Sequence, residues 1–317
     1  MMDITTGLRI SPPQATPLSS FRNPVEELLK HARRLRQNRE DSLALALLRK
    51  ATSLESDHFE TLSLMAEILG ETGKRSEALK VRKVLKEFHP DFSTFYEFAN
   101  ELYLTGDHDE EALKAYFECL AVMEEPCGQL FEIYKNMGNI SVKLSDFDGA
   151  EEFYNKAYTV KSDSDTLLVN FGTLEVQRGD FDKALFCFRQ AIQVNEKNDK
   201  AWVGLALMHS EYGDSALAWA NLTTALDLHP QNRTAVLLYA KWAFRDHREN
   251  LAIPIVETYL SLEHFDEELS LILIQLYVYL NEFTKAEIET TKILAWNPNF
   301  KEAREIQKQL RMIGEGA

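Results

Sequence analysis

Few residues in this sequence combine the type and the spacing that metal binding or catalysis requires. His108 stands between Asp107 and Asp109, and these three residues come nearest to a metal-ligand cluster. They fall where a turn between two helices is predicted, and short matches of this kind are weak indicators of a site. We therefore expect a solvated polar turn here and no bound metal.

The cysteines also indicate no site. Cys119, Cys127 and Cys187 form neither a C-x-x-C pair nor a zinc-type pattern with histidine. Cys187 lies between two phenylalanines with no basic residue directly beside it, so nothing in the sequence favours a reactive thiolate there. We expect reduced thiols in a cytoplasmic protein, with Cys187 buried as a small apolar residue.

Motifs that bind cofactors or build active sites are missing from the sequence. It contains no G-x-x-x-x-G-K-[ST] loop, no glycine triplet opening a helix, no G-x-S-x-G and no H-E-x-x-H. We expect no enzymatic activity and no cofactor.

Charge and composition argue against two further classes. The 317 residues include 35 Lys+Arg and 50 Asp+Glu, which gives a formal net charge of −15. A general nucleic-acid binder needs a basic face that displaces counterions from phosphate, so we expect no nucleic acid as partner. No stretch approaches the roughly 18 consecutive apolar residues of a membrane span, and the N-terminus lacks the basic start and apolar run of a signal peptide.

The positions of all these residues are governed by a repeat of 34 residues. Copies begin at 25, 59, 93, 131, 165, 199, 233 and 267, with four extra residues near 124–128. The eighth position is mostly small and the twenty-fourth mostly bulky, a combination that allows two antiparallel helices to cross closely. Proline at position 32 in three copies ends the second helix. The twentieth position is always alanine: Ala44, Ala78, Ala112, Ala150, Ala184, Ala218, Ala252 and Ala286.

This pattern resembles the tetratricopeptide repeat family over about residues 25–300. The fourth to sixth copies match best, with Trp202 at the fourth position and Pro230 at the end of the sixth. The first, seventh and eighth copies have the divergent turns Arg39-Glu40, His247-Arg248 and Asn281-Glu282, as is typical of repeats at the ends of an array. The resemblance implies an all-α, right-handed superhelical solenoid of about eight helix-turn-helix repeats, in which the first helices line a concave groove.

We expect four segments in the chain. A tail rich in Pro, Ser and Thr covers residues 1–24, repeats one to three cover 25–128, and repeats four to eight cover 129–300. Residues 301–317 are expected to form a capping helix and a C-terminal tail. In that helix Ala303, Ile306, Leu310 and Ile313 would lie on the last repeat, while Lys301, Arg304, Lys308 and Arg311 would face outward.

The resemblance places positions 2, 5, 9, 12 and 13 of each first helix in the groove. We expect an acidic groove in the first three repeats and a basic, apolar one in the rest, where apolar side chains would be costly to leave in water. The alternative is that the polar residues are only a solvated face. The acidic set is Glu26, Glu60, Glu67, Glu71, Glu97 and Glu101, partly offset by Arg33 and Arg36; the second set includes Lys135, Lys143, Lys200, Lys241, Arg245, Val169, Val176, Val203, Leu207, Leu237, Phe244, Leu271, Val278 and Tyr279.

Part of the groove resembles a carboxylate clamp. Some tetratricopeptide domains hold the C-terminal carboxylates of chaperone tails with five groove residues, and four of the matching positions agree here: Lys135, Asn139, Asn170 and Lys200. Two ammonium groups and two amides suit a carboxylate. Gly204 stands where the clamp has an arginine, which removes a planar donor that lysine does not replace. A less specific contact to an anion or a peptide remains the alternative.

Together these features predict a non-catalytic scaffold that binds a partner peptide, helix or protein surface, including an acidic or carboxylate-bearing segment, in the groove. Two alternatives stay open. One is self-assembly into a homo-dimer or larger oligomer through the groove or an end of the solenoid, which exposed Trp242, Tyr259 and Trp296 would support. The other is a groove occupied by the tail 1–24. The basic run on the first helix is expected to be a solvated end face. The predicted binding residues are Lys135, Asn139, Asn170, Lys200, Val203, Leu207, Leu237, Lys241, Phe244, Arg245 and Tyr279.

Overall fold

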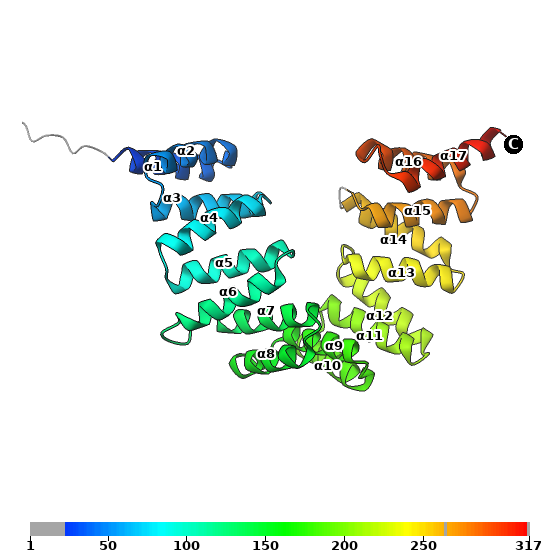
Figure 1. The fold of residues 1–317 in the computed structure, drawn as a ribbon. Coiled ribbons are helices and arrows are strands. Elements are labelled where there is room, and N and C mark those ends of the chain that lie inside the picture. The colour runs from blue at the N-terminus through cyan, green and yellow to red at the C-terminus, as the bar shows by residue number, and fades with distance from the viewer. Residues whose placement is uncertain (1–22, 263–264, 316–317) are drawn as a thin grey trace, which may run out of the picture. The chain divides into compact units, whose positions relative to one another are not determined.

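The computed structural model describes residues 23–262 and 265–315, and all regular secondary structure in these ranges is α-helical (Figure 1). The predicted all-α repeat fold is confirmed. The helices form two compact units that divide after Cys127. Within the described ranges, no helix has both the length and the apolar character needed to cross a bilayer.

The first unit contains three antiparallel helix pairs, one for each of the first three repeats. Each pair begins within a residue of the start that the sequence predicts. The helices are α1 (Pro24–Gln37), α2 (Asp41–Leu54), α3 (Phe59–Glu71), α4 (Arg75–Phe88), α5 (Phe92–Thr105) and α6 (Asp109–Ala121).

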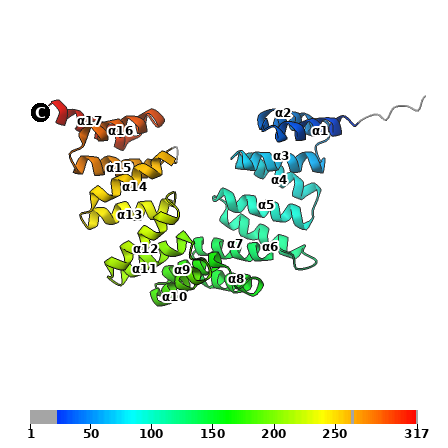
Figure 2. The same ribbon diagram turned by 180° about the vertical axis from the view of Figure 1, so that it is seen from behind.

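The second unit contains five such pairs and a single last helix, and Figures 1 and 2 show the pairs following one another in a stack. The helices are α7 (Leu130–Lys143), α8 (Phe147–Val160), α9 (Asp165–Arg178), α10 (Phe181–Val194), α11 (Asp199–Glu211), α12 (Ser215–Leu228), α13 (Arg233–Arg245), α14 (Glu249–Leu262), α15 (Glu267–Tyr279), α16 (Phe283–Trp296) and α17 (Lys301–Glu315).

Small residues at the helix crossings explain why each pair packs closely. The alanine at position 20 is fully buried in all eight repeats. At position 8, a Cβ atom on Gly172 would lie 2.6 Å from the ring of Phe188 on the second helix of the same repeat. No larger residue fits there, so the small residue at position 8 sets the spacing between the two helices.

Polar side chains fix where the helices begin. Asp180 accepts a hydrogen bond from the backbone N–H of Lys183 and so caps the N-terminus of α10. Asn198 caps α11 in the same way, and its amide also donates to the carboxylate of Asp165 at 2.9 Å. Because Asp165 is the first residue of α9, this bond ties the beginnings of two neighbouring first helices together.

The turn inside each of the eight repeats has a residue in the left-handed region. Glycine supplies it in four turns, but Arg39, Ser145, His247 and Asn281 adopt φ values of 56–62°. Three of these four lie in the turns that the sequence marked as divergent. A side chain in this region is strained, so the divergent repeats keep the geometry of the turn at a cost in stability.

Two of the three aromatic residues expected to be exposed are buried. Trp242 is 8% exposed and Tyr259 is 6% exposed. The ring of Trp242 packs edge-on against Trp219 at 5.8 Å, because position 10 of α13 faces the preceding repeat. That part of the argument for self-assembly is therefore wrong. Trp296 is 66% exposed, as expected, and its ring stacks on Phe265 at 5.1 Å.

Residues 1–22 lie outside the described residues. The expectation that the tail 1–24 occupies the groove concerns mainly these residues and stays a prediction. At the other end, Ala303 and Leu310 of α17 are buried, and the lysines and arginines of that helix are exposed.

Candidate functional site

A row of apolar side chains follows the first helices of the second unit, on the side that bears positions 2, 5, 9, 12 and 13, here called the groove face. Leu207, Leu237 and Phe244 are half-buried, and Tyr279 is 55% exposed. Val203 is only 6% exposed and contributes mainly to the core. The accessible apolar surface therefore increases towards the C-terminal repeats.

This row leads to a depression of about 490 Å³ between α13, α15 and α17. The rings of Phe244 and Tyr279 meet there almost at right angles, with centroids 6.4 Å apart. Two amide side chains, Gln275 and Gln309, are the polar groups of the lining. The apolar lining comes from Phe244, Ile274, Val278, Tyr279, Ile306 and Leu310.

Sequence analysis predicted Phe244 and Tyr279 as partner contacts but not the contribution of α17. The signal was available, because α17 begins at 301, one repeat length after α15 begins at 267. A helix in that register continues the groove face. Residues 301–313 were predicted only to cap the last repeat, so the contribution of α17 to the groove face was missed.

The four clamp-like residues do not form an open set of donors. Asn139 accepts hydrogen bonds at Oδ1 from the Tyr154 hydroxyl at 2.8 Å and from the Asn170 amide at 2.7 Å. Lys135 is ion-paired with Glu132 and only 15% exposed. Lys200 is exposed. The two asparagines therefore bond to each other, and one of the two lysines is already neutralised.

Gly204 is a glycine for a packing reason. A Cβ atom at this position would lie 2.5 Å from the ring of Phe188, the same ring that presses on Gly172. An arginine, as in the five-residue clamp, would have to displace this ring. The position is thus part of the interface between the fifth and sixth repeats.

The basic residues expected further along the groove face also have acidic partners. Lys241 lies 3.4 Å from Glu268, and Arg245 lies 2.7 Å from Asp246. The hydrogen bond from Arg245, with a second from the Trp219 indole at 2.8 Å, lowers the pKa of Asp246 to about 2. This end of the groove face is therefore close to neutral, and its accessible surface is mainly apolar.

Arginine pairs with four of the six glutamates of the expected acidic groove of the first unit. Arg36 reaches Glu67 at 2.6 Å and Glu71 at 2.9 Å. The side chain of Glu101 is only 4% exposed and is paired with Arg75 at 3.2 Å and Arg82 at 3.1 Å. Arg82 occupies position 24, where most repeats have a bulky apolar residue, and sequence analysis did not identify it as a partner of the groove carboxylates.

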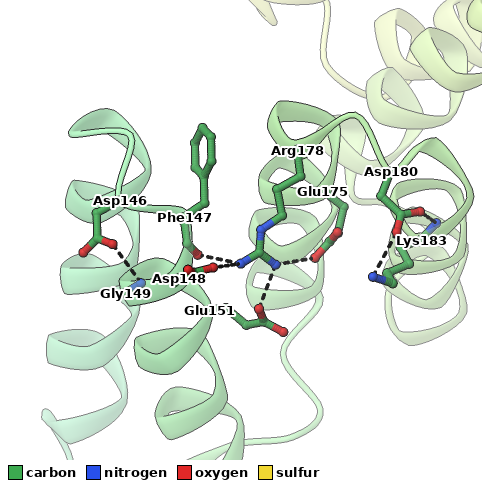
Figure 3. Close-up of polar contacts among 9 residues, drawn as sticks. All are labelled: Asp146, Phe147, Asp148, Gly149, Glu151, Glu175, Arg178, Asp180 and Lys183. Carbon is green, nitrogen blue, oxygen red and sulfur yellow. Dashed lines mark hydrogen bonds and ion pairs between the residues drawn. The ribbon is translucent and has the colours of Figure 1, made fainter.

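Arg178 joins the fourth and fifth repeats through a cluster of carboxylates (Figure 3). Its guanidinium lies 2.7 Å from Glu151, 3.0 Å from Asp148 and 3.2 Å from Glu175, and it donates to the carbonyl of Phe147. The hydrogen bond to Glu151 is the main cause of the raised pKa of Arg178. The cluster connects α9 with the beginning of α8.

Two of the thiols lie in surroundings that suppress their reactivity: Cys119 is buried, and Cys187, which we expected to be buried, is half-buried. Burial raises the pKa of Cys119 to about 12 and that of Cys187 to about 11, so both stay protonated near neutral pH. Across residues 23–262 and 265–315, no three His, Cys, Asp or Glu side chains are arranged to hold a metal ion.

Comparison with known proteins agrees with this geometry. Residues 131–164 and 166–198 match the tetratricopeptide repeat model, and the remaining helix pairs keep the same length and register. The matched residues are two tetratricopeptide repeats, and the described chain has the all-α fold of a tetratricopeptide repeat solenoid. No curated protein has a matching sequence.

Several solved structures share the fold at low sequence identity. The APC/C hetero-tetramer Cut9–Hcn1 is 17% identical with a TM-score of 0.55, over 78% of this chain and 48% of that chain, so this chain spans about half of its length. PilW, a type IV pilus biogenesis factor, is 12% identical with a TM-score of 0.56, over 68% and 98%. PilF of Pseudomonas aeruginosa is 13% identical with a TM-score of 0.52, over 69% and 97%.

Repeat arrays of this kind present extended surfaces to other proteins, and the family is generally a non-catalytic scaffold. The fold supports that general role for this chain.

Proposed function

We propose that this protein is a non-catalytic scaffold that binds an extended or helical segment of a partner protein on the groove face of its second unit. The depression between α13, α15 and α17 is the main anchoring point. The observation that carries this proposal is the 55% exposed ring of Tyr279 beside Phe244 in a depression of about 490 Å³.

The chemistry of the depression suits one bulky apolar side chain of the partner. Burying a side chain the size of leucine or phenylalanine contributes about 1.5–3 kcal/mol. The amides of Gln275 and Gln309 stand at the same depression and can both donate to and accept from the partner's backbone. Because most of the lining is held by core packing, little ordering is needed on binding.

The polar residues predicted from the sequence have a smaller role in this proposal. Lys200 is exposed and can attract a carboxylate, whereas Lys135, Asn139 and Asn170 already bond within the protein. A carboxylate must then compete with these internal partners. We therefore propose that the partner segment is anchored by an apolar residue, with Lys200 as an auxiliary contact to an acidic residue.

Photo-crosslinking tests where a partner binds. A benzophenone amino acid at position 279 should capture a partner from a lysate of the source cells, and mass spectrometry would identify the crosslinked segment. Tyr158 of α8 is also an exposed tyrosine, but it lies on a second helix, which makes position 158 the matched control. Capture of the same segment at position 158, or capture at neither position, would contradict the proposal.

End-to-end self-assembly is not favoured by the surfaces of the two terminal helices. Positions 3, 7 and 10 of a first helix are mostly apolar and buried against the preceding repeat, but in α1 they are Glu27, His31 and Arg34. The outward side of α17 carries Arg304 and Lys308. Stacking one copy on another would bury these charges, which is costly without matched partners.

A further inference from the structure

The helix α17 is a ninth first helix rather than an unrelated cap. It begins one repeat length after α15, and its buried residues Ala303 and Leu310 take positions 3 and 10. The same positions of α15, Leu269 and Leu276, are fully buried. Both views of the molecule show α17 beside α16 at the end of the stack (Figures 1 and 2).

In the earlier repeats one side of the first helix is covered by the second helix of the same repeat. Positions 4, 8 and 11 share a face because they are separated by four and three residues. In α13 they are Val236, Ala240 and Ala243, all fully buried. The contact of Gly172, at position 8, with Phe188 of α10 shows directly that this face meets the second helix.

The face of α17 that bears positions 4, 8 and 11 has a basic residue at each of these three positions. Arg304, Lys308 and Arg311 occupy positions 4, 8 and 11, and Lys301 precedes them at position 1; we call these four residues the basic row. All four are exposed, and none has an ion pair with a residue that the structure describes. Arg304 donates a hydrogen bond to the Asn299 side chain at 3.2 Å.

Three basic residues of the two groove faces are arranged differently. Arg36, Lys241 and Arg245 each have a carboxylate within 3.4 Å. In a chain with a net charge of −15, these four neighbouring exposed cations form a local basic surface. Its charge favours an anionic partner.

We propose that the basic row binds an acidic helix of a partner protein, which lies along α17. The row extends over three helical turns, about 15 Å, and a helix with carboxylates every three or four residues matches this spacing. Guanidinium and ammonium groups donate charge-assisted hydrogen bonds to carboxylates. A second copy that approached with its α1 would instead bring Lys30, Arg33 and Arg34 against the row, which is repulsive.

This surface is separate from the depression, because Ile306, Gln309 and Leu310 line the depression from another side of α17. The inference therefore stands apart from the function proposed for the groove face, and each can fail alone.

The test uses a designed peptide as the probe. It has about 20 residues of Ala, Leu and Glu, long enough to be helical, with all glutamates on one face. A second peptide has glutamine in place of every glutamate. Fluorescence anisotropy measures the binding of both peptides to the full chain at low ionic strength.

Two protein variants carry the same change in net charge. Arg304→Glu/Lys308→Glu/Arg311→Glu reverses the basic row, and Lys30→Glu/Arg33→Glu/Arg34→Glu reverses exposed cations of α1. We expect the first variant to bind the acidic peptide at least about tenfold more weakly than the unaltered chain, and the second to bind within about twofold. Added salt should weaken the binding.

Three results would overturn the inference: equal losses in the two variants, equal binding of the glutamine peptide, or binding to vesicles of anionic lipid without binding to the acidic peptide. Thermal unfolding followed by circular dichroism shows whether both variants keep their fold. Because all six substituted residues are exposed, we expect unchanged midpoints.

Discussion

The side-chain amide of Asn170 donates to the Oδ1 atom of Asn139 at 2.7 Å and so joins the first helices of the fourth and fifth repeats. The same oxygen accepts the hydroxyl of Tyr154 at 2.8 Å. Two residues that suggested a site for a partner's carboxylate thus form a bond between repeats.

This bond predicts the effect of Asn170→Ala. The substitution should lower the free energy of unfolding by about 1 kcal/mol, because it removes one hydrogen bond from a half-buried amide pair. Urea unfolding measures this loss, and exposed Lys200→Ala, with an expected change below about 0.5 kcal/mol, serves as the control. Unchanged stability combined with weaker partner binding would instead mean that Asn170 contacts the partner directly.

The contact between Gly204 and Phe188 gives a second prediction. Gly204→Ala places a Cβ atom 2.5 Å from the ring, so it should destabilise the protein by about 1–3 kcal/mol. Phe188→Leu alone should also destabilise it, by opening a cavity. In the double variant the smaller leucine side chain makes room for the added Cβ atom. The double variant should therefore lose less stability than the sum of the losses in the two single variants. Strictly additive losses in thermal unfolding would argue against the contact.

Arg178 is expected to stabilise the junction between the fourth and fifth repeats. Arg178→Met leaves the Glu175 carboxylate, whose side chain is 7% exposed, without its cationic partner, at a cost of about 2–4 kcal/mol. The Oε2 atom of Glu175 already lacks a hydrogen-bond partner among the described residues. No hydrogen bond to this atom therefore offsets the cost of burying the carboxylate charge. Adding Glu175→Gln should recover part of the loss. If urea unfolding shows no recovery, the buried charge is not the cause.

The strained turn of the seventh repeat predicts a stabilising change. His247 adopts φ 56°, and glycine reaches this region without a steric penalty. His247→Gly should raise the free energy of unfolding by about 0.5–1 kcal/mol. The matched control, Gly179→Ala at φ 79°, should lower it by a similar amount. A lower unfolding midpoint for His247→Gly would show that the histidine side chain stabilises the turn.

The repeat itself could be predicted from the sequence because packing constrains it directly. Two helices cross at positions 8 and 20, so position 20 is alanine in every repeat and position 8 is small in most of them. The boundaries of the repeats follow from this pattern. The same 34-residue spacing also predicts that α17 takes the place of a ninth first helix. The burial of Trp242 was missed because its position was judged by the divergence of its repeat and not by the face it occupies.

The electrostatics of the groove face could not be predicted in the same way. The sequence shows which charges lie on that side, but it does not show which partners they reach. Arg82 and Arg75 come from a second helix to neutralise Glu101, and Glu268 comes from the next repeat to Lys241. Such pairs depend on side-chain geometry between repeats, which a single repeat pattern does not specify.

The most direct test of the central claim is calorimetric titration of the segment captured at position 279. It would be titrated into the unaltered chain, into Tyr279→Ala, and into Lys135→Glu/Lys200→Glu. Tyr158→Ala serves as the control for loss of an exposed tyrosine. If the depression anchors the partner, Tyr279→Ala should weaken binding at least about tenfold, equal to about 1.4 kcal/mol, and the charge reversal by less than about threefold. The opposite order, with binding lost on charge reversal and retained by Tyr279→Ala, would contradict the account.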